Sequence, residues 1–277
     1  MLIEMKDVII SYPQTGTVLN KIDLNVEKGS LVGITGKAGC GKTTLLETIA
    51  CFHKPESGNV LFEGNNIYEK KYDGVYFRRK LQVVFQFPEN QFFETDVLKE
   101  ISFGLEMLNI PEEISKQRID EALNSVGLNG KDILNLSPFA LSGGQKRRLA
   151  LACSLVLRPE VLLLDEPFTG LDADGQKCMI ETLKKEHEKG MTVIMVSHDP
   201  DILCEIADRI IVLHDGKIVS DGSPVNVFSN ENDCIRYGVG LPDTKKAADM
   251  IGLGSLPDLS YDTFLKTLQK RISGDDK

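Results

Sequence analysis

A glycine-rich octapeptide, Gly36–Thr43, constrains the fold of this 277-residue chain more than any other feature. It matches the pattern G-x-x-x-x-G-K-[ST], follows the apolar run Leu31–Ile34 and precedes the helical run Thr43–Ala50. This order of strand, loop and helix predicts a phosphate-binding loop, in which backbone N–H groups and the positive end of a helix dipole face an anion. The alternative, a chance glycine-rich turn, is disfavoured by the strand and helix on either side.

The residue types in this loop indicate its ligand. We expect Lys42 to neutralise the β- and γ-phosphates of a nucleotide, and the Thr43 hydroxyl to ligate Mg²⁺. Cys40 lies beside the helix N-terminus, so we expect a lowered thiol pKa and a reactivity toward thiol reagents that ATP protects against. The residues of this loop expected to contact ATP are Gly36, Lys37, Ala38, Gly39, Cys40, Gly41, Lys42, Thr43 and Thr44.

Short apolar runs alternate with helical patterns over about the first 230 residues, which predicts a layered α/β fold. Several of these runs are continuously apolar, as expected for parallel strands that are covered on both faces. The segment His214–Lys217 predicts a hairpin turn after the last strand. The predicted strands are Val8–Ile10, Leu31–Ile34, Val83–Phe85, Val161–Leu164, Val193–Val196 and Ile210–Leu213.

Helical periodicity fills the stretch from about Phe92 to Leu157, which predicts a helical insertion between two halves of the α/β sheet. We therefore expect one α/β domain over residues 1–230 and a C-terminal extension over residues 231–277. The extension ends in a predicted amphipathic helix, capped by Ser260, whose apolar face could pack on its own chain. That face consists of Tyr261, Leu265, Leu268 and Ile272.

Composition narrows the class of protein. The formal net charge of −9 and an aromatic content of 6% without tryptophan disfavour a nucleic-acid-binding protein. No apolar run reaches the roughly 18–20 residues that span a bilayer, and the first residues do not resemble a signal peptide, so we expect a soluble, cytosolic chain. The six cysteines are far apart, which argues against a zinc site and a disulfide framework.

The segment Val161–Pro167 supplies two acidic side chains, which the phosphate loop lacks. A predicted buried strand ends in Asp165, which is suited to holding the Mg²⁺ shell, often through water. Glu166 follows directly and can polarise an attacking water molecule. An apolar strand that ends in Asp-Glu is common by itself, but together with the phosphate loop it indicates a nucleotide hydrolase.

The string Leu141–Gln145 narrows this class further. It places Ser142 and the flexible pair Gly143 and Gly144 at the start of a predicted helix, which would form a second anion site. A head-to-tail dimer would bring this site to the γ-phosphate held by the partner chain. The alternative is an ordinary serine-capped helix.

These motifs together resemble the ABC ATPase family over roughly residues 1–230. Gln86 after a strand, the string Gly170–Asp172 and the string Ser197–Asp199 complete the family's order and approximate spacing. The resemblance implies a cassette with an α/β core, an antiparallel β part and a helical subdomain at about residues 92–157. It also implies ATP hydrolysis with Mg²⁺ by a pair of such subunits, identical or paralogous.

The resemblance also assigns roles to single residues. It makes Glu166 the general base, supported by catalytic roles for Lys42 and His198, and it makes Gln86 a sensor of Mg²⁺ and of the attacking water. Asp172 would cross the dimer interface, and the signature residues Ser142, Gly143, Gly144 and Gln145 would contact ATP. The implied metal-binding set is Thr43, Gln86 and Asp165. Tyr12 either stacks on adenine or is a half-buried edge residue.

The segment Phe85–Phe93 resembles the ATPase subunits of energy-coupling factor transporters, which include cobalt and nickel importers. In that family this stretch lies beside a groove for the integral membrane partner. Phe92 and Phe93 could anchor such a helix, or they could pack inside the helical subdomain. A soluble iron–sulfur assembly ATPase and another type of ABC transporter subunit remain as alternatives.

The subfamily resemblance implies the location and the partners of the chain. The extension 231–277 would help two ATPase subunits to dimerise. The chain would lie peripherally at the cytoplasmic face of the cell membrane and bind an integral membrane transport component. A separate membrane component would bind the solute, a vitamin or a transition-metal micronutrient, and no nucleic acid is expected as a partner.

Overall fold

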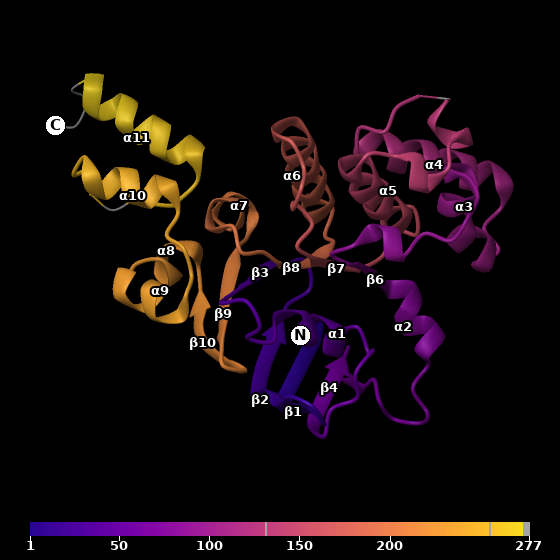
Figure 1. Cartoon of the computed structure of the whole chain (residues 1–277), viewed down its shortest axis with the longest axis horizontal. Coiled ribbons are helices and arrows are strands. Elements are labelled where there is room, and N and C mark those ends of the chain that lie inside the picture. Colours follow the sequence, from indigo (N-terminus) through magenta and orange to yellow (C-terminus); the bar gives the residue numbers. More distant parts are fainter. Residues whose placement is uncertain (131, 255, 274–277) are drawn as a thin grey trace. The chain divides into compact units, whose positions relative to one another are not determined.

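The computed structural model describes residues 1–130, 132–254 and 256–273. The chain divides into two compact units. The first unit combines Met1–Glu69 with Ile194–Lys277, and the second unit is Lys70–Val193. The second unit is therefore inserted into the sequence of the first, and Figure 1 shows the elements of each.

An antiparallel sheet forms much of the first unit. Its strand order is β2 (Gly16–Val26), β1 (Ile3–Tyr12), β4 (Ser57–Phe62) and β5 (Asn65–Asn66). The central strand β1 carries buried apolar side chains that alternate with exposed ones, broken by register shifts against its neighbours. This sheet confirms the antiparallel β part of the predicted fold.

A second set of strands in the first unit surrounds β3 (Leu31–Thr35), all five of whose residues are buried. β3 pairs in parallel with β9 (Arg209–His214), and β9 pairs antiparallel with β10 (Lys217–Gly222). The predicted hairpin turn is confirmed, because Asp215 and Gly216 connect β9 to β10 with φ angles of 45° and 71°. Such positive φ angles at both central residues match the right-handed twist of the flanking strands.

Two helices of the first unit begin at the ends of buried strands. α1 (Lys42–Ile49) follows β3, and α7 (Pro200–Ile206) follows β8 (Thr192–Val196). β8 carries the boundary between the units, since its last three residues belong to the first unit and its first two to the second. The backbone N–H of Ser197 donates to the carbonyl of Ile34 (3.1 Å), so the end of β8 lies beside the end of β3.

The second unit consists of two parallel strands and a group of helices. β6 (Leu81–Val84) pairs in parallel with β7 (Val161–Asp165), from Leu81 opposite Val161 to Val84 opposite Leu164. Three helices that pack on one another form the helical subdomain of the predicted fold. They are α3 (Val97–Met107), α4 (Glu112–Ser125) and α5 (Gly143–Leu155), and α2 (Gly74–Lys80) and α6 (Ala173–Glu188) complete the unit.

Among the described residues of the first unit, four helices follow β10. They are α8 (Pro224–Val227), α9 (Glu231–Tyr237), α10 (Asp243–Met250) and α11 (Tyr261–Ser273). Ser260 caps α11 as predicted, because its hydroxyl accepts a hydrogen bond from the N–H of Thr263 (3.3 Å). The apolar face of α11 is largely open to solvent, with Leu265 50% and Ile272 78% exposed.

Two expectations from composition can be compared with the structure. All six cysteines are free in the structure. Within residues 1–130, 132–254 and 256–273, no helix is both long enough and apolar enough to span a bilayer.

Candidate nucleotide-binding site

The phosphate loop Gly36–Thr43 leaves the end of β3 and enters α1, as predicted. Gly36 has a φ angle of 143°, and a Cβ at this position would stand 2.0 Å from the carbonyl oxygen of Leu213. Only glycine fits such an approach. α1 begins after Gly41 without a side-chain cap, so no capping side chain occupies the N–H groups of its first turn. These groups form an anion-binding helix N-terminus.

Lys42 places its positive charge over the same loop. Its Nζ donates to the carbonyl oxygens of Gly36 (2.8 Å) and Lys37 (3.1 Å), so the side chain folds back across the loop rather than extending into solvent. An ammonium group and a helix N-terminus at one short loop favour a multiply charged anion. The geometry of the loop therefore fits the phosphates of a nucleotide.

The thiol of Cys40 does not have the lowered pKa that the sequence predicts. Its side chain is buried, with 8% exposed, and this burial raises the pKa of the thiol above its usual value. The nearby charge of Lys42 lowers the pKa, but by less than burial raises it. The prediction of a lowered pKa is wrong because desolvation of the thiolate outweighs the field of the helix N-terminus.

Two other predicted site residues lie in the first unit. His198 is exposed directly after β8, at the strand edge from which the phosphate loop also leaves β3. Asp199, the next residue, caps α7 through the N–H groups of Asp201 and Ile202. The structure therefore brings His198 and the phosphate loop to the same edge of the strands.

Tyr12 lies at the end of β1 and is half-buried. Its ring meets the ring of His53 edge to face, with centroids 5.5 Å apart. His53 in turn contacts Glu47, with 3.0 Å between Nε2 and Oε2. Both alternatives for Tyr12, stacking on adenine and a structural edge position, are compatible with this half-buried ring.

In the second unit, three more residues predicted to belong to the site lie at the C-terminal ends of β6 and β7. Val84 of β6 pairs with Leu164 of β7, so Gln86 and Glu166 both follow two residues beyond this pair. Asp165 is the last residue of β7 and is buried. Glu166 has a φ of 49°, a left-handed conformation that costs a residue with a side chain about 1–2 kcal/mol. Strain of this kind gathers at functional sites.

Ser142 caps α5 in a reciprocal capping box. Its Oγ accepts from the N–H of Gln145 (3.2 Å), and the Oε1 of Gln145 accepts from the N–H of Ser142 (2.9 Å). The first residues of α5 are Gly143 and Gly144, as the motif predicted. Asp172 is the N-cap of α6, where its side chain accepts a hydrogen bond from the N–H of Gly175 (2.8 Å). Both side chains therefore also have a helix-capping role.

Sequence reasoning missed one residue that connects two of these motifs. Arg147, one turn into α5, donates from Nη1 to the carbonyl oxygen of Glu166 (2.9 Å). The helix that begins with the signature string therefore holds the backbone of the acidic pair after β7. The only signal in the sequence is a basic residue soon after Gln145, which is too common to be interpreted by itself.

The two phenylalanines after β6 have different environments. Phe92 is buried, with 6% exposed, whereas Phe93 is 59% exposed and meets the ring of Phe103 edge to face at 4.7 Å. The buried carboxylate of Glu100 accepts hydrogen bonds from the N–H groups of Phe93 (3.0 Å) and Glu94 (2.9 Å), which fixes the backbone at these two residues. Phe93 is thus a candidate surface anchor, and Phe92 belongs to the interior of the second unit.

The residues predicted to bind Mg²⁺ offer the oxygen donors that this cation prefers. They are the Thr43 hydroxyl, the Gln86 amide oxygen and the Asp165 carboxylate. Across the part of the chain that the structure describes, no group of three or more His, Cys, Asp or Glu could hold a metal ion. One hydroxyl, one amide oxygen and one carboxylate are donors of the kind that suits Mg²⁺, which usually keeps several water ligands and binds nucleotide phosphates.

The fold and these motifs define a phosphate-loop ATPase. A family model described as ABC transporter matches residues 19–169. The energy-coupling factor transporter ATP-binding protein EcfA2 of Clostridium perfringens is 40% identical over 81% of this chain and 79% of its own length. A putative ABC transporter ATP-binding protein of Pyrococcus horikoshii is 39% identical over 91% of this chain and 94% of its own.

Solved structures agree with the sequence comparisons. The cbiO1 protein of Clostridium perfringens, part of the ABC transporter complex cbiONQ, has a TM-score of 0.74 at 34% identity and covers 85% of this chain and 93% of its own. A bacterial ABC transporter cassette solved as a dimer has a TM-score of 0.71 at 30% identity. The match covers 80% of this chain and 99% of that cassette. The chain belongs to the ABC transporter family, as an ATP-binding subunit whose ATP hydrolysis is coupled to transport.

The environment of Cys40 leads to a test by alkylation. Because burial raises the thiol pKa, we expect iodoacetamide to modify Cys40 more slowly in the folded protein than in the same protein in urea. The rate in the folded protein should rise only at more alkaline pH, where the thiolate forms. Peptide mapping by mass spectrometry measures both rates, and equal rates at every pH would contradict the buried thiol.

Proposed function

We propose that this chain is the ATP-hydrolysing motor of an energy-coupling factor type importer, acting as one half of an ATPase pair on a membrane partner. The observation that carries the proposal is the phosphate loop, whose glycine, lysine and helix N-terminus form an anion site. The relatives named energy-coupling factor transporter ATP-binding proteins support the type of importer.

ATP would bind with its phosphates on the loop Gly36–Thr43 and its adenine near Tyr12. Lys42 would turn its ammonium from the loop carbonyls to the β- and γ-phosphates, which exchanges two neutral acceptors for charged ones. Mg²⁺, held by Thr43, Gln86 and Asp165, would neutralise part of the charge that develops on the phosphates.

Hydrolysis would require an oriented water molecule. Glu166 would accept its proton as general base, while His198 would hold the base and the water in place and contact the γ-phosphate. Gln86 would sense the cation and the water from the neighbouring strand end. Arg147 would position Glu166 through the hydrogen bond to its carbonyl oxygen.

Two ATPase subunits would complete each site in a head-to-tail dimer. Ser142, Gly143, Gly144 and Gln145 would face the γ-phosphate bound by the partner, and Asp172 would cross the interface. The solved dimer of a related bacterial cassette supports such a pair. We also propose that the open face of α11 contributes to dimerisation, since a face with Ile272 78% exposed is a surface that a second chain could cover.

Phe93 and Phe103 would form the contact with the integral membrane component. The rings stand edge to face, and both are exposed, by 59% and 41%. Aromatic anchors of this kind dominate the energy of helix-in-groove contacts. The chain would therefore lie at the cytoplasmic face of the membrane, and a separate membrane component would bind the vitamin or metal that is transported.

A substitution of the proposed base tests the chemistry. Glu166→Gln should bind ATP but hydrolyse it about 10²–10⁴ times more slowly, because the amide cannot accept the proton. The variant should accumulate as a closed dimer with ATP, measured by sedimentation. Glu160→Gln, at the residue just before the start of the same strand, is the matched control and should hydrolyse ATP at the wild-type rate. Normal turnover by Glu166→Gln would show that Glu166 is not the general base.

The membrane contact is tested by extracting tagged protein from native membranes in mild detergent and identifying what co-purifies by mass spectrometry. Phe93→Ser should weaken the affinity for the membrane component about thirtyfold and lower its recovery accordingly, since an aromatic anchor contributes about 2 kcal/mol or more. Ile114→Ser, which changes an exposed side chain on α4, should behave like wild type. Wild-type protein recovered only with soluble scaffold proteins would move the function to iron–sulfur assembly.

A further inference from the structure

We propose that residues 237–243, named the strap, position the phosphate loop and the start of α7, which follows His198, so that affinity for ATP depends on a segment in the C-terminal part of the chain. The family model ends at residue 169, and the strap connects α9 to α10 in the same unit as the phosphate loop. The inference rests on the proposed role of the phosphate loop in binding ATP.

The strap contacts the phosphate loop at Gly238. This residue ends α9 in a left-handed conformation with a φ of 66°, and the N–H of Val239 returns to the carbonyl of Cys234 (2.9 Å). A Cβ at Gly238 would stand 3.3 Å from Cβ and 3.5 Å from Cγ of Lys37. The backbone of the strap therefore lies directly against the aliphatic stem of the second residue of the phosphate loop.

The strap contacts the turn after His198 at its other end. The N–H of Asp243 donates to the Oδ1 of Asp201 on α7 (2.8 Å). Between these two ends, a Cβ at Gly240 would be 3.5 Å from Cγ of Pro200, the first residue of α7. One short segment thus contacts both the phosphate loop and the first residues of α7, which follow His198 in the chain.

A ring contact connects the strap to the hairpin that shapes the loop. Tyr237 and His214 have ring centroids 5.3 Å apart. His214 begins the β9–β10 turn, where the N–H of Gly216 donates to the carbonyl of Cys40 (3.3 Å). The strap therefore contacts the phosphate loop directly through Gly238 and indirectly through this turn.

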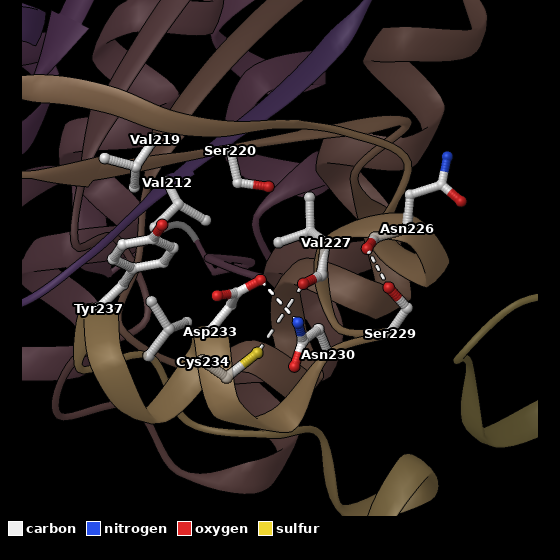
Figure 2. A pocket seen from close by; sticks show the side chains of 11 residues that line it. Val212, Val219, Ser220, Asn226, Val227, Ser229, Asn230, Asp233, Cys234 and Tyr237 are labelled. Carbon is white, nitrogen blue, oxygen red and sulfur yellow. Dashed lines mark hydrogen bonds between the residues drawn. The ribbon is translucent and has the colours of Figure 1, made fainter.

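A pocket between α9 and the β9–β10 hairpin shows that packing there is incomplete. It has a volume of about 110 Å³, and Tyr237 and Val212 line one side of it (Figure 2). Polar groups in its wall pair with one another, with the Nδ2 of Asn230 2.8 Å from the Oδ2 of Asp233. The pocket therefore lies beside the end of α9, where the strap begins.

A steric substitution tests this role. Asparagine tolerates the left-handed conformation better than most residues, so Gly238→Asn adds a side chain against Lys37 with little backbone strain. Gly252→Asn is the matched control, because Gly252 has a φ of 63° and open space around it. We expect Gly238→Asn to raise the KM for ATP about fivefold. The kcat should change less, and both variants should unfold at the same temperature without nucleotide.

A double variant shows whether the effect passes through Lys37. In a Lys37→Ala background the stem beyond Cβ is absent, so Gly238→Asn should raise the KM by a smaller factor than in wild type. The same factor in both backgrounds would overturn the contact as the cause, and equal KM values for Gly238→Asn and Gly252→Asn would overturn the role of the strap. Wild-type protein that shows no saturable ATP binding would instead refute the proposed function.

Discussion

The backbone of the phosphate loop and the end of β9 approach so closely that no side chain fits between them. The carbonyl oxygen of Leu213 lies 2.0 Å from the place of a Cβ on residue 36, so β9 sets the path of the loop. The turn after β9 then hydrogen-bonds to Cys40 through the N–H of Gly216 and to Asn20 through its carbonyl oxygen. The loop takes its shape from strands that are distant in sequence as well as from its own glycines.

A second constraint governs the acidic pair after β7. Glu166 stands in a left-handed conformation, and its carbonyl oxygen accepts the hydrogen bond from Arg147. The same helix carries Ser142 at its first turn, so a shift of α5 along its axis would move both the signature string and the backbone of Glu166. This connection gives a physical route by which the proposed contact of Ser142 with ATP would alter the position of Glu166, the proposed base.

Local signals in the sequence predicted much of the fold. The strand before the phosphate loop, the helical insertion and the β9–β10 turn each follow from apolar runs, periodicity or a turn sequence, and the structure confirms them. The capping role of Ser142 also follows from its place before a helix. These features depend on residues that are close in the chain, which is why sequence patterns predict them.

Features that depend on distant contacts could not be predicted. Burial of Cys40 reverses the expected direction of its pKa, and nothing local distinguishes buried Phe92 from exposed Phe93. The hydrogen bond from Arg147 to Glu166 joins residues 19 positions apart. The contact of Gly238 with Lys37 joins the two separate sequence segments that make up the first unit, so it is visible only in three dimensions.

Equilibrium binding of ATP to the purified chain, measured by calorimetry on wild type and Gly36→Ala, tests the central claim most directly. We expect saturable binding by wild type, and a loss of binding by Gly36→Ala while circular dichroism still shows a folded protein. The reason is that the added methyl group must displace the loop from the carbonyl of Leu213. Equal affinity of the two proteins for ATP would contradict the claim that this loop, shaped by β9, is the nucleotide site.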